Sequence, residues 1–225
     1  MKYLGFIALI TIIIFGGCDD TVGTMELKGK ALDENTKVAI PRRKIIIQAL
    51  TKGDNNQTYV DAGQFISDSS GCFTYTLNKV KNAYLYHFYC VGDSAYASST
   101  ILLGLTELNR YGMFLSFSLC KLADLSITIY RKSQTPACDT LYVSWESNGL
   151  EGKYLYPYKV ENYGIKQDIE FRWIGKKYKS VIKTKAIADK MTKIRYEIVR
   201  NRKRKEFTDT IVCKRDVANY AYFKY

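Results

Sequence analysis

The chain has 225 residues, of which 47% are hydrophobic, and it carries a formal net charge of +12. Its single histidine excludes a histidine-rich zinc site. After the first apolar run, no segment is long and apolar enough to cross a membrane as a helix.

The first 17 residues have the organisation of a secretory signal. Lys2 precedes an apolar run of twelve residues from Leu4 to Phe15, and two glycines follow it. A membrane-spanning helix needs about 20 apolar residues, so this run is too short to span a bilayer and fits the core of a signal peptide. A buried segment of the fold is the alternative. We predict that residues 1–17 are a signal peptide and that the rest of the chain is exported.

The end of this signal, Phe15-Gly16-Gly17-Cys18, resembles the lipobox of bacterial lipoproteins, although Phe15 stands where leucine is usual. The resemblance implies that Cys18 bears the lipid and that residues 18–26 are a lipidated N-terminus and linker. It also implies a cell-envelope protein attached to a membrane, with the outer membrane favoured over the inner and the leaflet left open. Two or more acyl chains anchor a protein firmly. Ordinary cleavage that leaves Cys18 unmodified is the alternative.

Strand signals dominate residues 27–119. Phe73, Tyr75 and Leu77 alternate with polar neighbours, and the turn cluster Asp68-Ser69-Ser70-Gly71 precedes them. This passage and the earlier one from Gly29 through Pro41 to Ile47 resemble the carboxypeptidase-regulatory-like domain. The resemblance implies a transthyretin-like sandwich of about seven strands without catalytic residues, which serves as a spacer or interaction module.

Residues 120–225 predict a second β-sandwich, either Ig-like or transthyretin-like. Leu125, Ile127 and Ile129 alternate with polar residues, as do Ile194, Tyr196 and Ile198. The sequence shows no internal repeat. The expected fold class is therefore all-β, with two antiparallel sandwiches after the signal peptide.

The positive charge is concentrated in the C-terminal third. Residues 18–149 hold 13 basic and 13 acidic residues, whereas residues 150–225 hold 20 basic and 9 acidic ones, a net charge of +11. The densest run predicts a contact with a polyanion such as an acidic glycan, and comprises Arg200, Arg202, Lys203, Arg204 and Lys205. Export argues against nucleic acid as the partner. A solvated hairpin loop without a ligand is the alternative.

Five cysteines follow Cys18, and one pair has a geometric argument. If residues 72–77 and 84–91 form a hairpin, Cys72 lies opposite Cys90, within reach of a disulfide. Two buried free thiols are the alternative. Cys120 with Cys138 is a weaker pairing.

No catalytic motif, metal site or cofactor site is predicted. His87 fits a strand histidine better than a general base or metal ligand, since those roles need partners. A pair of carboxylates brought together by the fold stays open. The aromatic residues fit strand packing, with sugar stacking as the alternative; the stacking candidates are Trp145, Tyr154, Tyr156, Tyr158 and Trp173.

These observations predict a lipid-anchored, non-catalytic envelope protein that acts as a binding or structural module for an acidic glycan or a protein partner. The alternatives are an envelope hydrolase with a carboxylate pair and a subunit of a membrane assembly. The first alternative requires a cleft with two facing acids of unlike environment.

Overall fold

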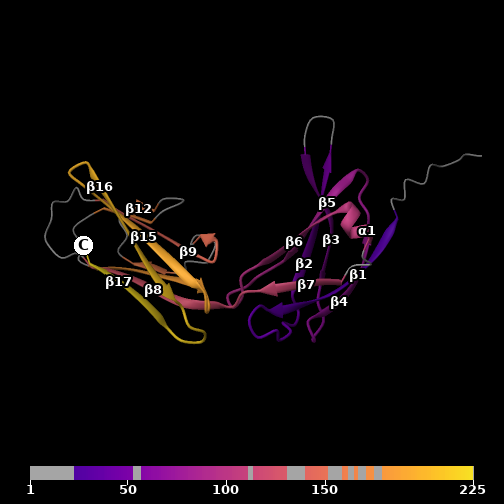
Figure 1. Ribbon diagram of the computed structural model, residues 1–225, viewed down its shortest axis with the longest axis horizontal. Helices are drawn as coiled ribbons and strands as arrows, with labels where there is room; N and C mark the ends of the chain where they lie inside the picture. Colours follow the sequence, from indigo (N-terminus) through magenta and orange to yellow (C-terminus); the bar gives the residue numbers. More distant parts are fainter. Residues whose placement is uncertain are drawn as a thin grey trace, which may run out of the picture.

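The computed structural model describes residues 23–52, 57–110, 114–130, 140–151, 159–161, 165–166, 171–174 and 179–224 (Figure 1). Strands make up almost all of the regular structure, as the alternating sequence predicts. Within the described ranges the one helix is α1 (Leu105–Arg110), and no helix there is long and apolar enough to cross a membrane.

The first seven strands form two sheets that pack as an N-terminal sandwich. The first sheet has the order β4 (Cys72–Asn78), β1 (Thr24–Asp33), β7 (Phe114–Leu119). The second has the order β3 (Gln57–Ile66), β2 (Lys44–Lys52), β5 (Ala83–Cys90), β6 (Ser99–Gly104). All pairs are antiparallel except β1 with β7.

The turn before β4 forms as its sequence predicts. The Asp68 carboxylate accepts hydrogen bonds from the Ser70 and Cys72 amides at 2.8 and 2.9 Å, and Gly71 has a φ of +75°. This backbone region favours glycine. Phe73 and Tyr75 then point to the same face, where both contact the Phe65 ring at centroid distances of 4.9 and 4.6 Å.

The predicted hairpin between β4 and β5 is wrong, and the Cys72–Cys90 disulfide is wrong with it. β4 pairs with β1, where Cys72 lies opposite Lys30, whereas β5 lies in the other sheet, where Cys90 lies opposite Ile45. Both thiols are free. The chain therefore crosses from one sheet to the other between β4 and β5. The Val80 amide in this crossing donates to the Tyr86 hydroxyl at 2.9 Å.

Strands β8 to β17 form a C-terminal sandwich of two further sheets. One has the order β11 (Lys159–Glu161), β14 (Lys179–Ile187), β8 (Leu122–Tyr130), β17 (Asn219–Lys224). The other has the order β12 (Ile165–Lys166), β13 (Phe171–Ile174), β9 (Thr140–Ser147), β15 (Met191–Arg200), β16 (Lys203–Val212), with β10 (Leu150–Glu151) on β9.

The two sandwiches share one strand topology that the sequence does not reveal. In each, the first strand lies between an antiparallel strand and a parallel final strand: β1 between β4 and β7, β8 between β14 and β17. The second sheets agree as well, since the run β3-β2-β5-β6 corresponds to β13-β9-β15-β16. The second sandwich therefore repeats the strand order of the first.

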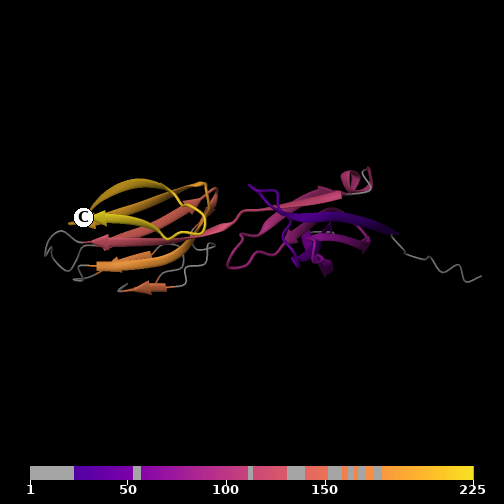
Figure 2. The same cartoon turned by 90° about the horizontal axis from the view of Figure 1, so that it is seen from below.

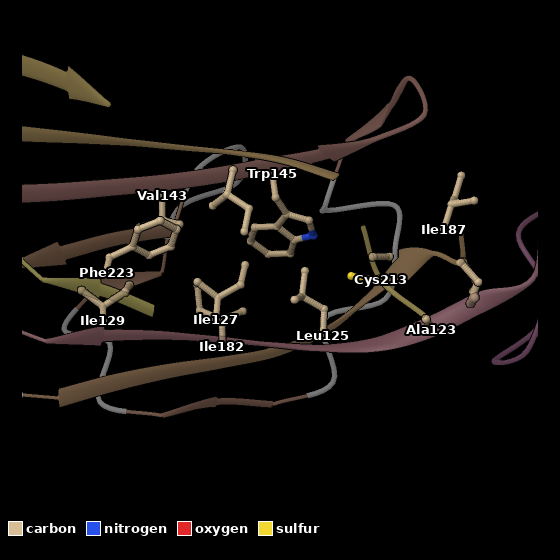
Figure 3. Packing of buried hydrophobic residues seen from close by; sticks show 14 of the residues in the cluster. Ala123, Leu125, Ile127, Ile129, Val143, Trp145, Ile182, Ile187, Cys213 and Phe223 are labelled. Carbon is tan, nitrogen blue, oxygen red and sulfur yellow. The ribbon is translucent and has the colours of Figure 1, made fainter. Parts of the chain in front are cut away.

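A hydrophobic core fills the space between the sheets of each sandwich. In the C-terminal sandwich, Trp145 of β9 is 3% exposed, and its ring lies among residues that include Val143, Leu125 and Cys213 (Figure 3). Trp145 is therefore a packing residue, and burial excludes it as a sugar-stacking residue. The N-terminal core is centred on Tyr86, Phe88 and Phe117, which are fully buried.

The sandwiches lie end to end (Figures 1 and 2) and meet in a polar joint. The Ala97 amide donates to the Cys120 carbonyl at 2.9 Å, and the Leu122 amide donates to the Ala95 carbonyl at 2.7 Å. Arg215, in the turn before β17, contacts Asp33 at the end of β1. β1 ends at this joint with Asp33, and β15 begins there after Lys190, so the two strands lie on opposite sides of the joint (Figure 1).

Candidate functional site

The basic run predicted from the sequence lies at the tip of the β15–β16 hairpin. Arg200 pairs with Lys203, and the turn between them consists of Asn201 and Arg202, with φ values of +49° and +62°. Two consecutive positive φ values define the type I′ turn that joins two-residue hairpins. The hairpin therefore brings the cations of the run to one end of the molecule, on the side away from the joint (Figure 1).

Strand alternation divides these cations between two faces. The cross-strand pairs Arg200 with Lys203 and Ile198 with Lys205 lie on one face, and Glu197 with Glu206 on the other. Arg204 takes the second face and forms an ion pair with Glu197 at 2.9 Å. The run is thus not one continuous patch, because successive side chains of a strand point in opposite directions.

A groove of about 590 Å³ opens on the first face, with Lys224 of β17 at its border. In the N-terminal sandwich the final strands β6 and β7 pack against each other. The corresponding strands β16 and β17 diverge, which leaves the inner face of β16 uncovered (Figure 1). The groove is lined by Tyr196, Ile198, Arg200, Asn201, Lys203, Lys205, Phe207 and Lys224.

Aromatic rings form the floor of this groove. Tyr196 and Phe207 stack with their centroids 5.0 Å apart and their planes 10° apart. Tyr196 also contacts Phe223 from the opposite sheet at 4.4 Å, so the floor is continuous with the core. The Lys205 Nζ lies 4.9 Å from the centroid of Phe207, a cation–π contact that holds the ammonium over the floor.

The electrostatics of the groove favour an anionic ligand. Arg200 and three lysines surround the aromatic floor, and no described lining residue is a carboxylate, a thiol or an imidazole. Burial raises the pKa of Tyr196, and the charge of Asp209 raises it further, so the hydroxyl stays neutral. The groove can therefore bind charge and a flat apolar surface together, but the described lining offers no acid–base pair.

Among the described residues, two facing carboxylates of the kind that a hydrolase would need lie on the second face of the hairpin. Glu197 and Glu206 lie opposite each other in register, beside a pocket of about 230 Å³ that Tyr142 also lines. Glu197 is held by Arg204, as described above, and the nearby Glu146 is held by Arg195 at 3.3 Å. These contacts indicate a network of ion pairs on a sheet surface.

The remaining sequence candidates are dispersed. His87 lies on β5 opposite Gln48 and Leu102, with Tyr89 at an edge-on ring distance of 6.3 Å. No three metal-ligating side chains gather anywhere in the described ranges. Several candidates lie outside the described residues or have side chains that are not described: Cys18, Cys138, Tyr154, Tyr156, Tyr158 and Trp173.

Three residues that line the groove were not predicted from the sequence as ligand-binding residues: Tyr196, Phe207 and Lys224. Tyr196 alternates with Ile194 and Ile198 and therefore has the pattern of a core residue. Only the divergence of β16 from β17 exposes its ring. Phe207 follows the basic run at even spacing from Lys203 and Lys205, which is the one signal that could have placed it on the same face.

No protein-family model and no curated protein sequence matches the chain. Among solved structures, it is similar over 92% of its length to a Streptococcal ancillary pilin, with a TM-score of 0.39 and 12% identity, and it spans 63% of that chain. It is similar to a candidate adhesin from Bacteroides ovatus with a TM-score of 0.37 and 8% identity, over 92% of this chain and 94% of the other. It is similar to the shaft pilin SpaA from Lactobacillus rhamnosus GG with a TM-score of 0.33 and 9% identity, over 89% of this chain and 97% of the other.

Proposed function

We propose that the protein is a lipid-anchored, non-catalytic module of the cell envelope that binds an acidic ligand in the groove of its C-terminal sandwich. The observation that carries this proposal is the groove itself, in which Arg200, Lys203, Lys205 and Lys224 surround an aromatic floor. Cations around an apolar floor attract a ligand that combines anionic groups with ring surfaces.

The direction of the chain supports a role at a distance from the membrane. The lipid would be attached at Cys18, six residues before Thr24 at the start of β1. From Thr24, β1 runs toward the joint, and beyond the joint β15 runs on to the hairpin tip (Figure 1). At about 3.3 Å per residue, each of these ten-residue strands is roughly 33 Å long, and the two lie on opposite sides of the joint. The N-terminal sandwich then serves as a spacer.

A binding titration over a range of salt concentrations tests the groove. The protein is purified in detergent and titrated with acidic polysaccharides and with a neutral polysaccharide of similar length. We expect binding of the acidic chains at roughly 0.05 M salt and a loss of about tenfold in affinity at roughly 0.5 M, because salt screens exposed charges. Absence of binding to any acidic chain at low salt contradicts the proposed function.

A further inference from the structure

A row of tyrosines lies on the outer face of the sheet that contains β17. Tyr220 and Tyr222 are 54% and 58% exposed. On the neighbouring strand β8, Ser126 lies opposite Tyr220 and Thr128 lies opposite Tyr222. Two residues further along β8, Tyr130 lies opposite Lys224. Tyr130, Tyr220 and Tyr222 are called the tyrosine row below.

The rings of this row are regularly arranged. Tyr220 and Tyr222 have centroids 6.3 Å apart and planes 17° apart, and Tyr222 and Tyr130 have centroids 6.4 Å apart and planes 18° apart. Three rings with nearly equal steps and a nearly common orientation form an extended aromatic track. The track crosses from the edge strand β17 to β8.

Cations border the track, and the nearby acid is neutralised. The Lys179 Nζ lies 5.7 Å from the centroid of Tyr130, so Tyr130 is flanked by Lys179 on one side and Lys224 on the other. The Asp124 carboxylate on the same face is ion-paired with Lys185 at 2.8 Å. The face therefore has positive charge at the end where the track meets Lys224.

Lys224 connects this face to the groove. It lines the groove on one side and lies in register with Tyr130 on the other. An extended ligand that leaves the groove past Lys224 therefore arrives at Tyr130.

We propose that the tyrosine row is a second subsite, which stacks the sugar rings of an acidic polysaccharide whose charged groups occupy the groove. The binding of the charged groups in the groove rests on the function proposed above. The row adds the substrate class: a polymer built of pyranose rings, since each pyranose presents an apolar C–H face that packs on an aromatic ring.

The composition of the face favours a glycan over a protein partner. The described residues beside the tyrosine row carry mostly hydroxyl and ammonium groups. They are Ser126, Thr128, Lys179 and Lys183, together with the aliphatic Val181. Protein interfaces are depleted of lysine at their centre. Hydroxyl and ammonium groups beside aromatic rings instead match the alternating hydroxyl and C–H surfaces of a sugar chain.

The test compares two acidic polymers that differ in their rings. Polygalacturonate carries carboxylates on pyranose rings, and poly-L-glutamate carries carboxylates without rings. Affinities of the full chain in detergent are measured for both, with wild type, the double variant Tyr220→Ala/Tyr222→Ala and the control Tyr59→Ala. Tyr59 is a matched control because it is 58% exposed on β3 of the other sandwich. Tyr222→Phe is added because it keeps the ring, and circular dichroism verifies that each variant is folded.

We expect the double variant to bind polygalacturonate about tenfold more weakly, since two stacked rings are lost. Its affinity for poly-L-glutamate should change less than about twofold, and Tyr59→Ala and Tyr222→Phe should bind both polymers like wild type.

Four results would overturn the inference. If the double variant binds polygalacturonate like wild type, or loses affinity for both polymers equally, the row does not bind sugar rings. The proposed function of the groove still stands in that case if Lys205→Gln weakens binding. If the double variant instead loses binding to mixed micelles of detergent and anionic phospholipid, the row contacts membrane lipid. If wild type binds neither polymer at low salt, the groove function and the inference fail together.

Discussion

Arg215 joins the two sandwiches by donating two hydrogen bonds to Asp33, a residue 182 positions earlier in the chain. The distances are 3.0 Å from Nη1 to Oδ2 and 3.2 Å from Nη2 to Oδ1, and the Arg215 Nε donates to Asp189 at 2.6 Å. Asp33 is 3% exposed. Bidentate pairing of this kind fixes both distance and orientation. Together with the backbone hydrogen bonds of Ala97 and Leu122, it constrains the direction in which the second sandwich extends from the first.

Replacing Asp33 with Asn should destabilise the protein and flatten its response to acid. Burial alone would raise the pKa of Asp33, but hydrogen bonds from Arg215 and from the Thr36 and Asn35 amides outweigh it and hold the pKa well below 3.8. The ionised carboxylate therefore contributes stability above pH 3.8, and this is lost as the pH falls toward the folded-state pKa. We expect Asp33→Asn to cost about 2–3 kcal/mol at pH 7 and less at pH 3, measured by urea unfolding.

The exposed Asp61 on β3 provides the control for this measurement. Asp61→Asn should change the free energy of unfolding by less than about 0.5 kcal/mol. Equal stabilities of Asp33→Asn and wild type at pH 7 would show that the joint does not depend on this ion pair.

The two faces of the β15–β16 hairpin should differ in their effect on ligand binding. Lys205 lies over the groove floor, whereas its chain neighbour Arg204 is on the other face with Glu197. Removing one charge at either position changes the net charge equally. Lys205→Gln should weaken binding of an acidic polysaccharide about fivefold, and Arg204→Gln less than about twofold, measured by calorimetry at low salt. Equal losses would indicate general attraction to the basic hairpin instead of a groove.

Gly29 should not tolerate a side chain. It lies on the central strand β1 between Phe73 and Leu115, and an added Cβ would overlap the Phe73 ring and the Leu115 carbonyl oxygen. Gly29→Ala should therefore cost about 2 kcal/mol in thermal or urea unfolding, as overpacking does. Gly104→Ala is the matched control, since a Cβ there meets atoms only at 3.7 Å or more. Wild-type stability for Gly29→Ala would mean that β1 and β7 can separate at little cost.

Cys72 and Cys90 should react with thiol reagents at very different rates in the native protein. Cys72 is exposed, whereas burial raises the pKa of Cys90 to about 12, an effect that nearby Arg43 only partly offsets. Relative to a thiol of pKa 9.0, Cys90 then has about a thousandfold less thiolate. Peptide mapping should find Cys72 labelled in the native state and Cys90 only after unfolding. A peptide that contains both cysteines joined by a disulfide would contradict the separation of β4 and β5.

Cys18→Ser should remove the protein from the membrane fraction or block its maturation. The expectation follows from the resemblance of Phe15-Gly16-Gly17-Cys18 to a lipobox, in which the cysteine thiol accepts the lipid. Fractionation after metabolic labelling with a fatty acid measures it. A variant that still carries the label and sediments with membranes would show that another residue holds the anchor.

Alternation along the sequence was sufficient for the strands and their faces. Phe73 and Tyr75 share a face as predicted, and Asp68 and Gly71 form the turn before them. The basic hairpin was also predictable, because Arg200 to Lys205 follow an alternating strand. These features are local: each depends on residues within one strand or one turn.

The sequence by itself determined the all-β fold class, the position of the positive charge and the export signature, because composition and period-two patterning act over a few residues. The tertiary structure decided which strands became neighbours. It separated Cys72 from Cys90, paired Asp33 with Arg215, and opened a groove by letting β16 and β17 diverge. Those outcomes depend on which sheet each strand enters. The sheet that each strand enters depends on how the whole chain buries its apolar residues. A local sequence pattern does not predict this.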